Sequence, residues 1–363
     1  MLAIKRGKIS EIIEQRSELT KVKVELRTGE IRKAINYDDL TGVVSLQDEV
    51  IVNTTAVELG LGTGGYDFIV YVEGSEPKNL DGLGHIMKLR YSPFQLKTFS
   101  VEEEASSWHK EIKNFTSLRE HPVIVGSLHS MLAPVAIVLN ELSDFSLKLA
   151  YIMTDGAALP LKFSDTVAKL KQKDFLGTTI TIGHAFGGDL EAINIHSGLA
   201  AAKEVVEADV TIVAMGPGIV GTGTQYGFSG IEQGEIINAV SSLDGIPLAI
   251  PRISFSDQRK RHYGFSHHTL TVLEKIALKE AVVGVPKLSS TDKQEELTKQ
   301  LIEADLNQKH DIRYRDGNEL LELVSKSDIG VSTMGRNEKE DPEFFMTAGI
   351  AGLLALEELE VSF

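Results

Sequence analysis

Residues 209–215 spell DVTIVAM, and residues 216–230 continue as GPGIVGTGTQYGFSG. The first stretch is a short, near-continuous apolar run, which is typical of a strand that is covered on both faces of a parallel sheet. Comparable runs alternate with segments of helical period from His121 onward, as they do in βαβ units. The sequence therefore predicts an α/β fold with a mainly parallel, Rossmann-like sheet and flanking helices.

The expected elements follow from the same pattern. The predicted strands are residues 122–126, 147–153, 178–183, 209–215, 246–251 and 328–332. The predicted helices are residues 131–142, 165–173, 199–207, 231–243 and 267–280. The charged stretch 291–326 is expected to form solvated helices, and a last helix is expected after Asp341 and Pro342, a cap residue and a proline at the first helical position.

The first part of the chain has a different period. In residues 21–26 Val22, Val24 and Leu26 alternate with charged residues, and the turn residues Thr28 and Gly29 follow. This period of two predicts a hairpin, and further short strands are expected at 49–53 and 68–72. We expect a small β-barrel-like module over residues 1–75, an α/β domain over 76–363, and a linker near 74–84, which is rich in glycine and proline.

Composition excludes several classes of protein. The chain has 363 residues, of which 42% are hydrophobic and 25% charged, as in ordinary globular proteins, and it has no cysteine. Disulfides, thiolate nucleophiles and thiolate metal sites are therefore excluded. The net charge of −15 disfavours nucleic acid and anionic membranes as partners. Without an apolar stretch long enough to span a bilayer or a signal-peptide core at the start, the protein is expected in the cytoplasm.

Polar side chains follow the predicted strands. In an open parallel sheet, ligands bind beyond the carboxyl ends of the strands, where the loops converge. Five of the ten histidines lie on these loops. The candidates for acid–base or metal-assisted chemistry are His129, Asp155, His184 and His267. Each of them taken alone could equally cap a helix or a turn.

The segment after residue 215 is rich in glycine, with seven glycines in residues 216–234. Successive glycine N–H groups can form an anion-binding nest. The candidate ligand-binding residues are Gly216, Gly218, Gly221, Thr222, Gly223 and Thr224. A dinucleotide fingerprint is discounted because Pro217 interrupts it and a similar glycine pattern occurs at Gly60, Gly62 and Gly65. A tight crossover packed on a neighbouring loop remains the alternative.

Residues 252–268 carry a local positive charge, opposite in sign to the net charge of the chain. They contain Arg252, Arg259, Lys260 and Arg261 but a single acid, Asp257. Arginine presents a planar fork that fits phosphate or carboxylate, so Arg259 and Arg261 are predicted to bind an anion, with His268 beside the glycine nest. The alternative is a solvated basic loop that pairs with acidic neighbours.

A metal is left open, and no cofactor is assigned. His129, Asp155, His184, Asp189 and the pair His267 and His268 are suitable ligands for Zn, Mn or Fe, but their spacing matches no known site. In the last helix Ala348, Gly349, Ala351, Gly352 and Ala355 permit close backbone approach; packing against the sheet is favoured over a dimer seam, and a homo-oligomer is left open.

Five segments together resemble a known family. They are TAVELGLGTGG (residues 55–65), TDGAALP (154–160), GPGIVGTGT (216–224), SDQRKRHYGFSHH (256–268), and TMGR with DPEFF (333–336 and 341–345). The chain resembles, over nearly its whole length, an uncharacterised bacterial family catalogued only as a domain of unknown function. The resemblance implies no activity, substrate or catalytic residue.

Two function classes remain. The first is a protein that binds, and as an enzyme acts on, a phosphorylated or other anionic small molecule in a cleft at the carboxyl edge of the sheet. The second is a non-catalytic metabolite sensor or interaction protein whose β module contacts a partner. A titratable pair within hydrogen-bond reach at the edge would favour the enzyme.

Overall fold

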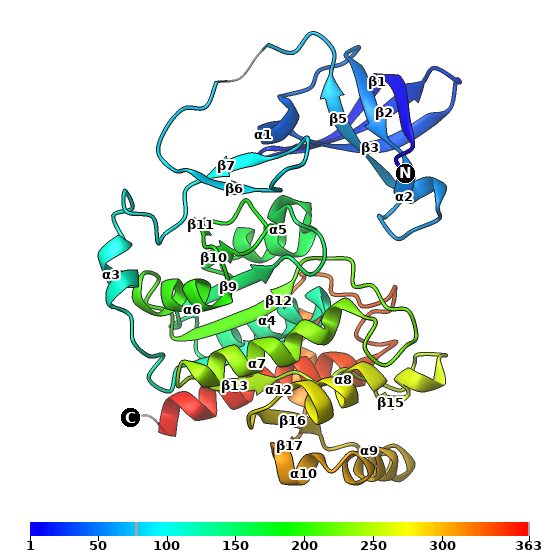
Figure 1. Cartoon of the computed structure of the whole chain (residues 1–363). Helices are drawn as coiled ribbons and strands as arrows, with labels where there is room; N and C mark the ends of the chain where they lie inside the picture. Colours follow the sequence, from blue (N-terminus) through cyan, green and yellow to red (C-terminus); the bar gives the residue numbers. More distant parts are fainter. Residues whose placement is uncertain (77–78, 362–363) are drawn as a thin grey trace. The chain divides into compact units, whose positions relative to one another are not determined.

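A computed structural model describes residues 1–76 and 79–361 (Figure 1). The chain forms two compact units. The first comprises Met1–Leu83 and Leu89–Lys97, and the second comprises Gly84–Lys88 and Thr98–Phe363. No helix within the described residues is both long and apolar enough to cross a membrane.

The first unit contains a closed five-stranded barrel with strand order β1-β2-β3-β5-β4. Its strands are β1 Ile4–Arg16, β2 Leu19–Leu26, β3 Ile31–Tyr37, β4 Glu49–Asn53 and β5 Tyr66–Val72, with short helices α1 Asp38–Thr41 and α2 Thr55–Glu58. The predicted alternation holds, because Val22, Val24 and Leu26 are all buried in the barrel core. Two register shifts in β1 let this long strand curve around the barrel. The prediction of an N-terminal barrel is confirmed.

The second unit is built on an eight-stranded sheet in the order β11-β10-β9-β12-β8-β13-β16-β17, and every pairing in it is parallel. The strands are β8 Pro122–Val125, β9 Leu149–Thr154, β10 Thr178–Thr181, β11 Leu190–Glu191, β12 Val210–Met215, β13 Ile246–Ala249, β16 Val282–Pro286 and β17 Asp311–Arg315. All residues of β8, β9 and β12 are buried, as expected for central strands. The predicted parallel α/β fold is confirmed.

Helices cover both faces of this sheet (Figure 1). One apolar core includes α4 Leu132–Leu142, α5 Asp165–Gln172, α11 Asn318–Lys326 and α12 Pro342–Val361. The other includes α6 Ile195–Glu204, α7 Glu232–Ser242, a π-helical turn Val272–Ile276 that continues α8 His267–Thr271, and α9 Thr291–Glu303. The smaller elements are β6 Ile86–Lys88, β7 Leu96–Thr98, α3 His109–Asn114, α10 Leu306–Lys309 and the hairpin strands β14 Ile253–Ser254 and β15 Gly264–Phe265.

The structure corrects three predicted elements. Residues 328–332 form no strand, because Asp328 and Gly330 have φ angles of 54° and 72°, which an extended strand cannot accommodate. The charged stretch 291–326 is not all helical, since it contains strand β17 between α10 and α11. The helix predicted over 267–280 ends at Ile276, and strand β16 follows it.

The packing of α12 on the sheet depends on a glycine in β16. A Cβ added at Gly284 would lie 2.6 Å from Cγ2 of Ile350 and 3.0 Å from Cδ1 of Leu354, both fully buried in α12. We predict that Gly284→Ala lowers the free energy of unfolding by about 1–3 kcal/mol through overpacking. Urea unfolding followed by circular dichroism measures this. Gly62→Ala is the control, because a Cβ there meets nothing within 4 Å; an equal loss in both variants would contradict the explanation.

The boundary between module and α/β domain stays a prediction. The expected linker, residues 74–84, contains residues 77 and 78, which lie outside the described residues. Leu80 and Leu83 are exposed, whereas every residue of β12 is buried. We predict that brief chymotrypsin digestion cuts at these leucines before it cuts within β12, as mass spectrometry of the fragments would show. First cleavage inside β12 would argue against the boundary.

Candidate functional site

The loops after β9 and β12 separate at the carboxyl edge of the sheet. These strands are neighbours, but the chain leaves β9 toward β10 and leaves β12 toward β13 on the opposite side. Such a switch point is where parallel sheets bind ligands. The two loops touch: Ala158 N donates to Pro217 O at 3.0 Å, and a Cβ at Gly216 would lie only 2.4 Å from Ala158 O. Gly216 therefore serves a tight crossover.

Two carboxylates lie beside this crossover. Glu232, at the start of α7, accepts a hydrogen bond from Thr154 Oγ1 at 2.6 Å, and Asp155 Oδ2 accepts one from His184 N at 2.9 Å. Burial raises the pKa of Glu232 to about 7; the Thr154 hydrogen bond opposes this, and the charge of Asp155 adds to it. Glu232 can therefore exchange a proton near neutral pH, which is the property of an acid–base group.

His129 is held by internal hydrogen bonds at both ring nitrogens. Nδ1 lies 3.2 Å from Tyr151 Oη and 3.2 Å from Met215 O, and Nε2 lies 2.6 Å from Ser164 Oγ. Burial lowers the pKa of His129 to about 4, so the ring is neutral at neutral pH. Through these hydrogen bonds His129 links three neighbouring segments, and neither ring nitrogen is left for a ligand.

Three histidines gather on the hairpin that follows β13 and at the start of α8. In this histidine cluster, His262, His267 and His268, one ring nitrogen of each lies within 4.8 Å of those of the other two. The ring centroids are 5.1 Å apart for His262 and His267, 5.1 Å for His262 and His268, and 4.2 Å for His267 and His268. Nε2 of His267 and Nδ1 of His268 are buried without a hydrogen-bond partner among the described residues.

The surroundings keep these imidazoles neutral. Burial is the largest cause, and it lowers the pKa of His262 to about 3 and that of His268 to about 3. The pKa of His267 is also lowered, by burial and then by the nearby charges of Arg261 and other arginines. The cluster therefore lies in a positive potential and presents unprotonated nitrogens.

The glycine loop, residues 216–224, approaches this cluster. A Cβ added at Gly221 would lie 3.2 Å from Cε1 of His268, and Phe228 stacks on His268 with centroids 3.9 Å apart and planes at 7°. The hydroxyls of Thr222 and Thr224 lie 2.9 Å apart, and Thr222 also donates to Gly227 O, so these two residues stabilise the turn of the loop. The loop itself is exposed over residues 220–226.

The loop also approaches the basic segment: a Cβ at Gly223 would lie 4.0 Å from Nη1 of Arg261. Arg261 is exposed and has no hydrogen bond or ion pair within residues 1–76 and 79–361. Gly218, with φ of 108°, has open space where a Cβ would be.

Arg259 has a different environment from Arg261. Asp257, which is 7% exposed, accepts hydrogen bonds from Arg259 Nε at 2.9 Å and Arg259 Nη2 at 2.7 Å and from Arg252 Nη2 at 2.8 Å. Burial alone would raise the pKa of Asp257, but the hydrogen bonds from Arg259 and the charges of both arginines hold it well below its usual value. Asp257 thus neutralises part of the basic segment.

The predicted site residues divide into two groups. His184 follows β10, and the histidine cluster follows β13, four positions further along the sheet. At about 4.8 Å per strand, the strands β10 and β13 themselves lie roughly 19 Å apart. Asp155 and His184 therefore lie together, while His267, His268, Arg261 and the outer glycine loop form the other group. Asp189 belongs to neither, because its carboxylate is bound by Lys171 and Thr179.

Sequence reasoning assigned no role to two residues of interest. His262 lies six positions from His268 in the printed sequence, so the clustering of three histidines was a visible signal for it. Glu232 carries no motif, because its proximity to Thr154 and Asp155 arises only when β9 and β12 pair.

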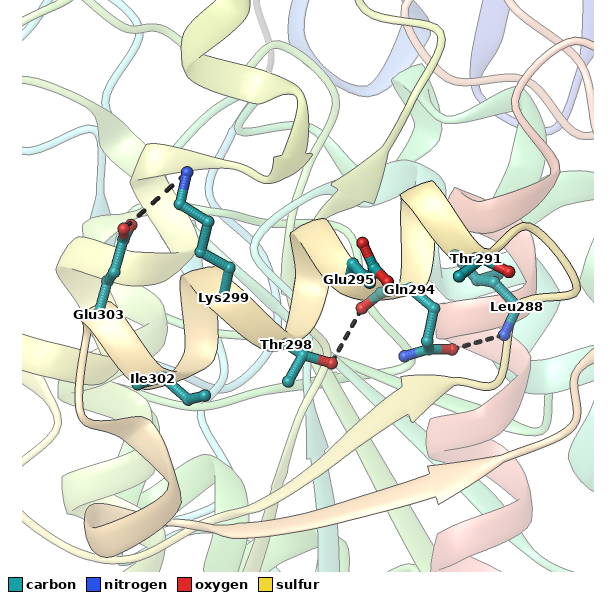
Figure 2. Close-up of a pocket in the computed structure, with 8 residues that line it drawn as sticks. All are labelled: Leu288, Thr291, Gln294, Glu295, Thr298, Lys299, Ile302 and Glu303. Atoms are coloured by element: carbon teal, nitrogen blue, oxygen red, sulfur yellow. Dashed lines mark hydrogen bonds and ion pairs between the residues drawn. The ribbon is translucent and has the colours of Figure 1, made fainter.

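A hollow of about 680 Å³ lies elsewhere, along α9 (Figure 2). Its lining includes Gln294, whose Oε1 accepts from Leu288 N at 2.8 Å, and Lys299, whose Nζ lies 4.0 Å from Glu303. No histidine, arginine or glycine lines it. It is a surface groove distinct from both groups.

The fold and these loops define a class: an α/β protein with an all-parallel sheet, a barrel unit before it, and polar groups gathered at the carboxyl edge. The chain belongs to the family described as Protein of unknown function (DUF3866), which matches residues 33–352. The match runs from within β3 to within α12. No curated protein and no solved structure matches the chain.

The raised pKa of Glu232 makes stability depend on pH. Raising this pKa from 4.5 to about 7 on folding favours the protonated form, so its contribution is complete below pH 4.5 and lost as pH rises toward 7. We predict that Glu232→Gln, which keeps an acceptor for Thr154, gains stability relative to the parent between pH 5 and 8, by up to about 3 kcal/mol. Urea unfolding at several pH values measures the difference. A difference that does not change with pH would contradict the prediction.

Proposed function

We propose that the protein binds a phosphorylated or other anionic small molecule at the carboxyl edge, in an anion site formed by the glycine loop, Arg261 and the histidine cluster. The observation that carries the proposal is the environment of Arg261. An exposed guanidinium without a partner among the described residues lies against Gly223, where no side chain blocks access to the backbone. A guanidinium beside glycine N–H groups is a suitable arrangement for an oxyanion.

The local charge supports this proposal. Arg252 and Arg259 share the single carboxylate of Asp257, so this part of the segment keeps a positive charge even before Arg261 is counted. In a chain of net charge −15 such a region is reversed in sign. The N–H groups of Gly221 and Gly223 also have no hydrogen-bond partner in the described part of the chain.

The same site would support acid–base chemistry on the bound anion. The free Nε2 of His267 can accept a proton, and the lowered pKa of this ring leaves it neutral and available at neutral pH. We therefore propose His267 as the general base of the site, with Arg261 orienting the anion. Binding without any turnover would instead favour a metabolite sensor.

The test is thermal unfolding of the chelator-treated protein in phosphate and in chloride at equal ionic strength. We predict that phosphate raises the melting temperature of the parent and that Arg261→Ala weakens phosphate binding roughly tenfold or more, because a charge-assisted hydrogen bond contributes about 1.5–3 kcal/mol. Lys260→Ala is the matched control, since Lys260 is an exposed neighbour of the same charge.

The comparison also separates the two arginines. Arg259→Ala should lower stability in every buffer, because it removes two hydrogen bonds from the buried Asp257. If Arg261→Ala responds to phosphate as the parent does, the basic segment is a solvated loop and the proposed anion site is wrong.

A further inference from the structure

We propose that His262, His267 and His268 form a binding site for a divalent transition metal, with three imidazole ligands and an open position toward the glycine loop. This deepens the proposed function and rests on it in one respect: the open position would face the same anion. It also replaces the general-base role of His267, because Nε2 of this ring cannot bind a metal and accept a proton at the same time. The metal itself can be tested without any anion.

The geometry is close to that of a metal site. The three candidate nitrogens lie within 4.8 Å of one another. Nitrogens that share a tetrahedral zinc at about 2.0–2.1 Å lie roughly 3.3 Å apart. Closing the remaining distance would need rotation about χ2, which is a broad torsion, mainly of His267, because Ser266 holds the ring of His262 and Phe228 stacks on that of His268.

The unpartnered nitrogens are the second observation. A buried polar atom without a partner costs about 1–3 kcal/mol, so native structures leave few of them. Here two adjacent rings, His267 and His268, each leave one buried nitrogen without a partner in the described part of the chain. A metal shared by the cluster would satisfy both nitrogens at once.

Other buried histidines of this chain differ from the cluster. His121 Nε2 lies 2.8 Å from Thr211 Oγ1, and both nitrogens of His129 are in hydrogen bonds. His310 is bonded at Nδ1 by Ala281 N and at Nε2 to Leu273 O. Where the fold uses a histidine for structure, it supplies partners. The unpartnered nitrogens of the cluster therefore indicate a ligand.

Ser266 is a positioning residue beside the histidine cluster. Ser266 Oγ lies 2.7 Å from Nδ1 of His262 and accepts a hydrogen bond from His268 N at 3.2 Å. With Nδ1 protonated and donating to this hydroxyl, His262 presents the lone pair of Nε2. Such an outer hydrogen bond fixes the tautomer and the orientation of metal-ligating histidines.

The ligand set selects the kind of metal. Three imidazole nitrogens suit zinc, cobalt, nickel, copper and iron, whereas magnesium and calcium prefer oxygen ligands. Nearby arginines oppose a bare dication, so the metal would be bound most favourably together with an anion at its open position. Metal and anion should therefore each increase the affinity for the other.

The first experiment uses the full-length protein treated with a chelator and exchanged into phosphate-free chloride buffer. Zn²⁺ and Co²⁺ are added separately, and metal content after desalting is measured by mass spectrometry. We expect one equivalent per chain, and for Co²⁺ a visible spectrum of a site with nitrogen ligands. Less than a tenth of an equivalent of either ion, with no cobalt spectrum, would overturn the proposal.

Variants assign the ligands. His267→Gln and His268→Gln should each weaken metal binding about a hundredfold or more, since loss of even an outer hydrogen bond can cost 10–100-fold. His196→Gln is the control, because His196 is an exposed histidine at the start of α6. Equal binding by the cluster variants and the control would refute the assignment.

A further measurement, on the parent protein, tests the site even if the variants fail to fold. X-ray absorption of the zinc-loaded parent should show imidazole ligation at about 2.0–2.1 Å; a spectrum with oxygen ligands alone would refute the site. Failure of this inference is distinguishable from failure of the anion site. Arg261→Ala should lose the phosphate response and still bind zinc, whereas a parent that responds to phosphate but binds no metal keeps the proposed function and loses this inference.

Discussion

The insertion of β12 between β8 and β9 is the constraint on which the rest of the carboxyl edge depends. β12 pairs with β9 along its whole length and with β8 over residues 211–213, so its following loop must emerge beside that of β9. The two loops then leave in opposite directions, and only a residue without a side chain fits at Gly216, where they cross. The same pairing places the first turn of α7 against Thr154, which buries Glu232 beside Asp155.

Buried ion pairs and hydrogen bonds hold the β14–β15 hairpin in place. Asp257 binds Arg252 and Arg259, and the fully buried Asp341 accepts hydrogen bonds from Ser254 Oγ at 2.8 Å and from Arg336 Nε at 3.0 Å. These contacts join the β14–β15 hairpin to the start of α12. Buried ion pairs of this kind are a weak source of stability but strongly resist the loss of one partner. Their effect here is to hold the hairpin that carries the histidines in one position.

The central strands could be predicted from the sequence because they are apolar on both faces. The prediction was wrong where contacts with neighbouring elements determine the secondary structure. β17 was missed because Asp311, Arg313 and Arg315 look like solvated positions, although Arg313 and Arg315 pair with glutamates of α12. Within residues 328–332 Ile329 and Val331 are apolar and buried, but the segment lies in a loop. In the site, polar residues after each strand were foreseeable. The different environments of Arg259 and Arg261 were not foreseeable, since they depend on where Asp257 lies.

Two features that cost stability lie at the carboxyl edge of the sheet. Glu232 is buried with a raised pKa, and two nitrogens of the histidine cluster have no partner within residues 1–76 and 79–361. Both features follow strands at their carboxyl ends, whereas buried histidines away from this edge have hydrogen-bond partners, at Nε2 for His121 and at both ring nitrogens for His310. Sequences depart from locally favourable choices mainly at functional sites. The glycine loop contacts the loop that carries Asp155 where it leaves β12, and it reaches His268 at Gly221, so one backbone segment connects the two groups.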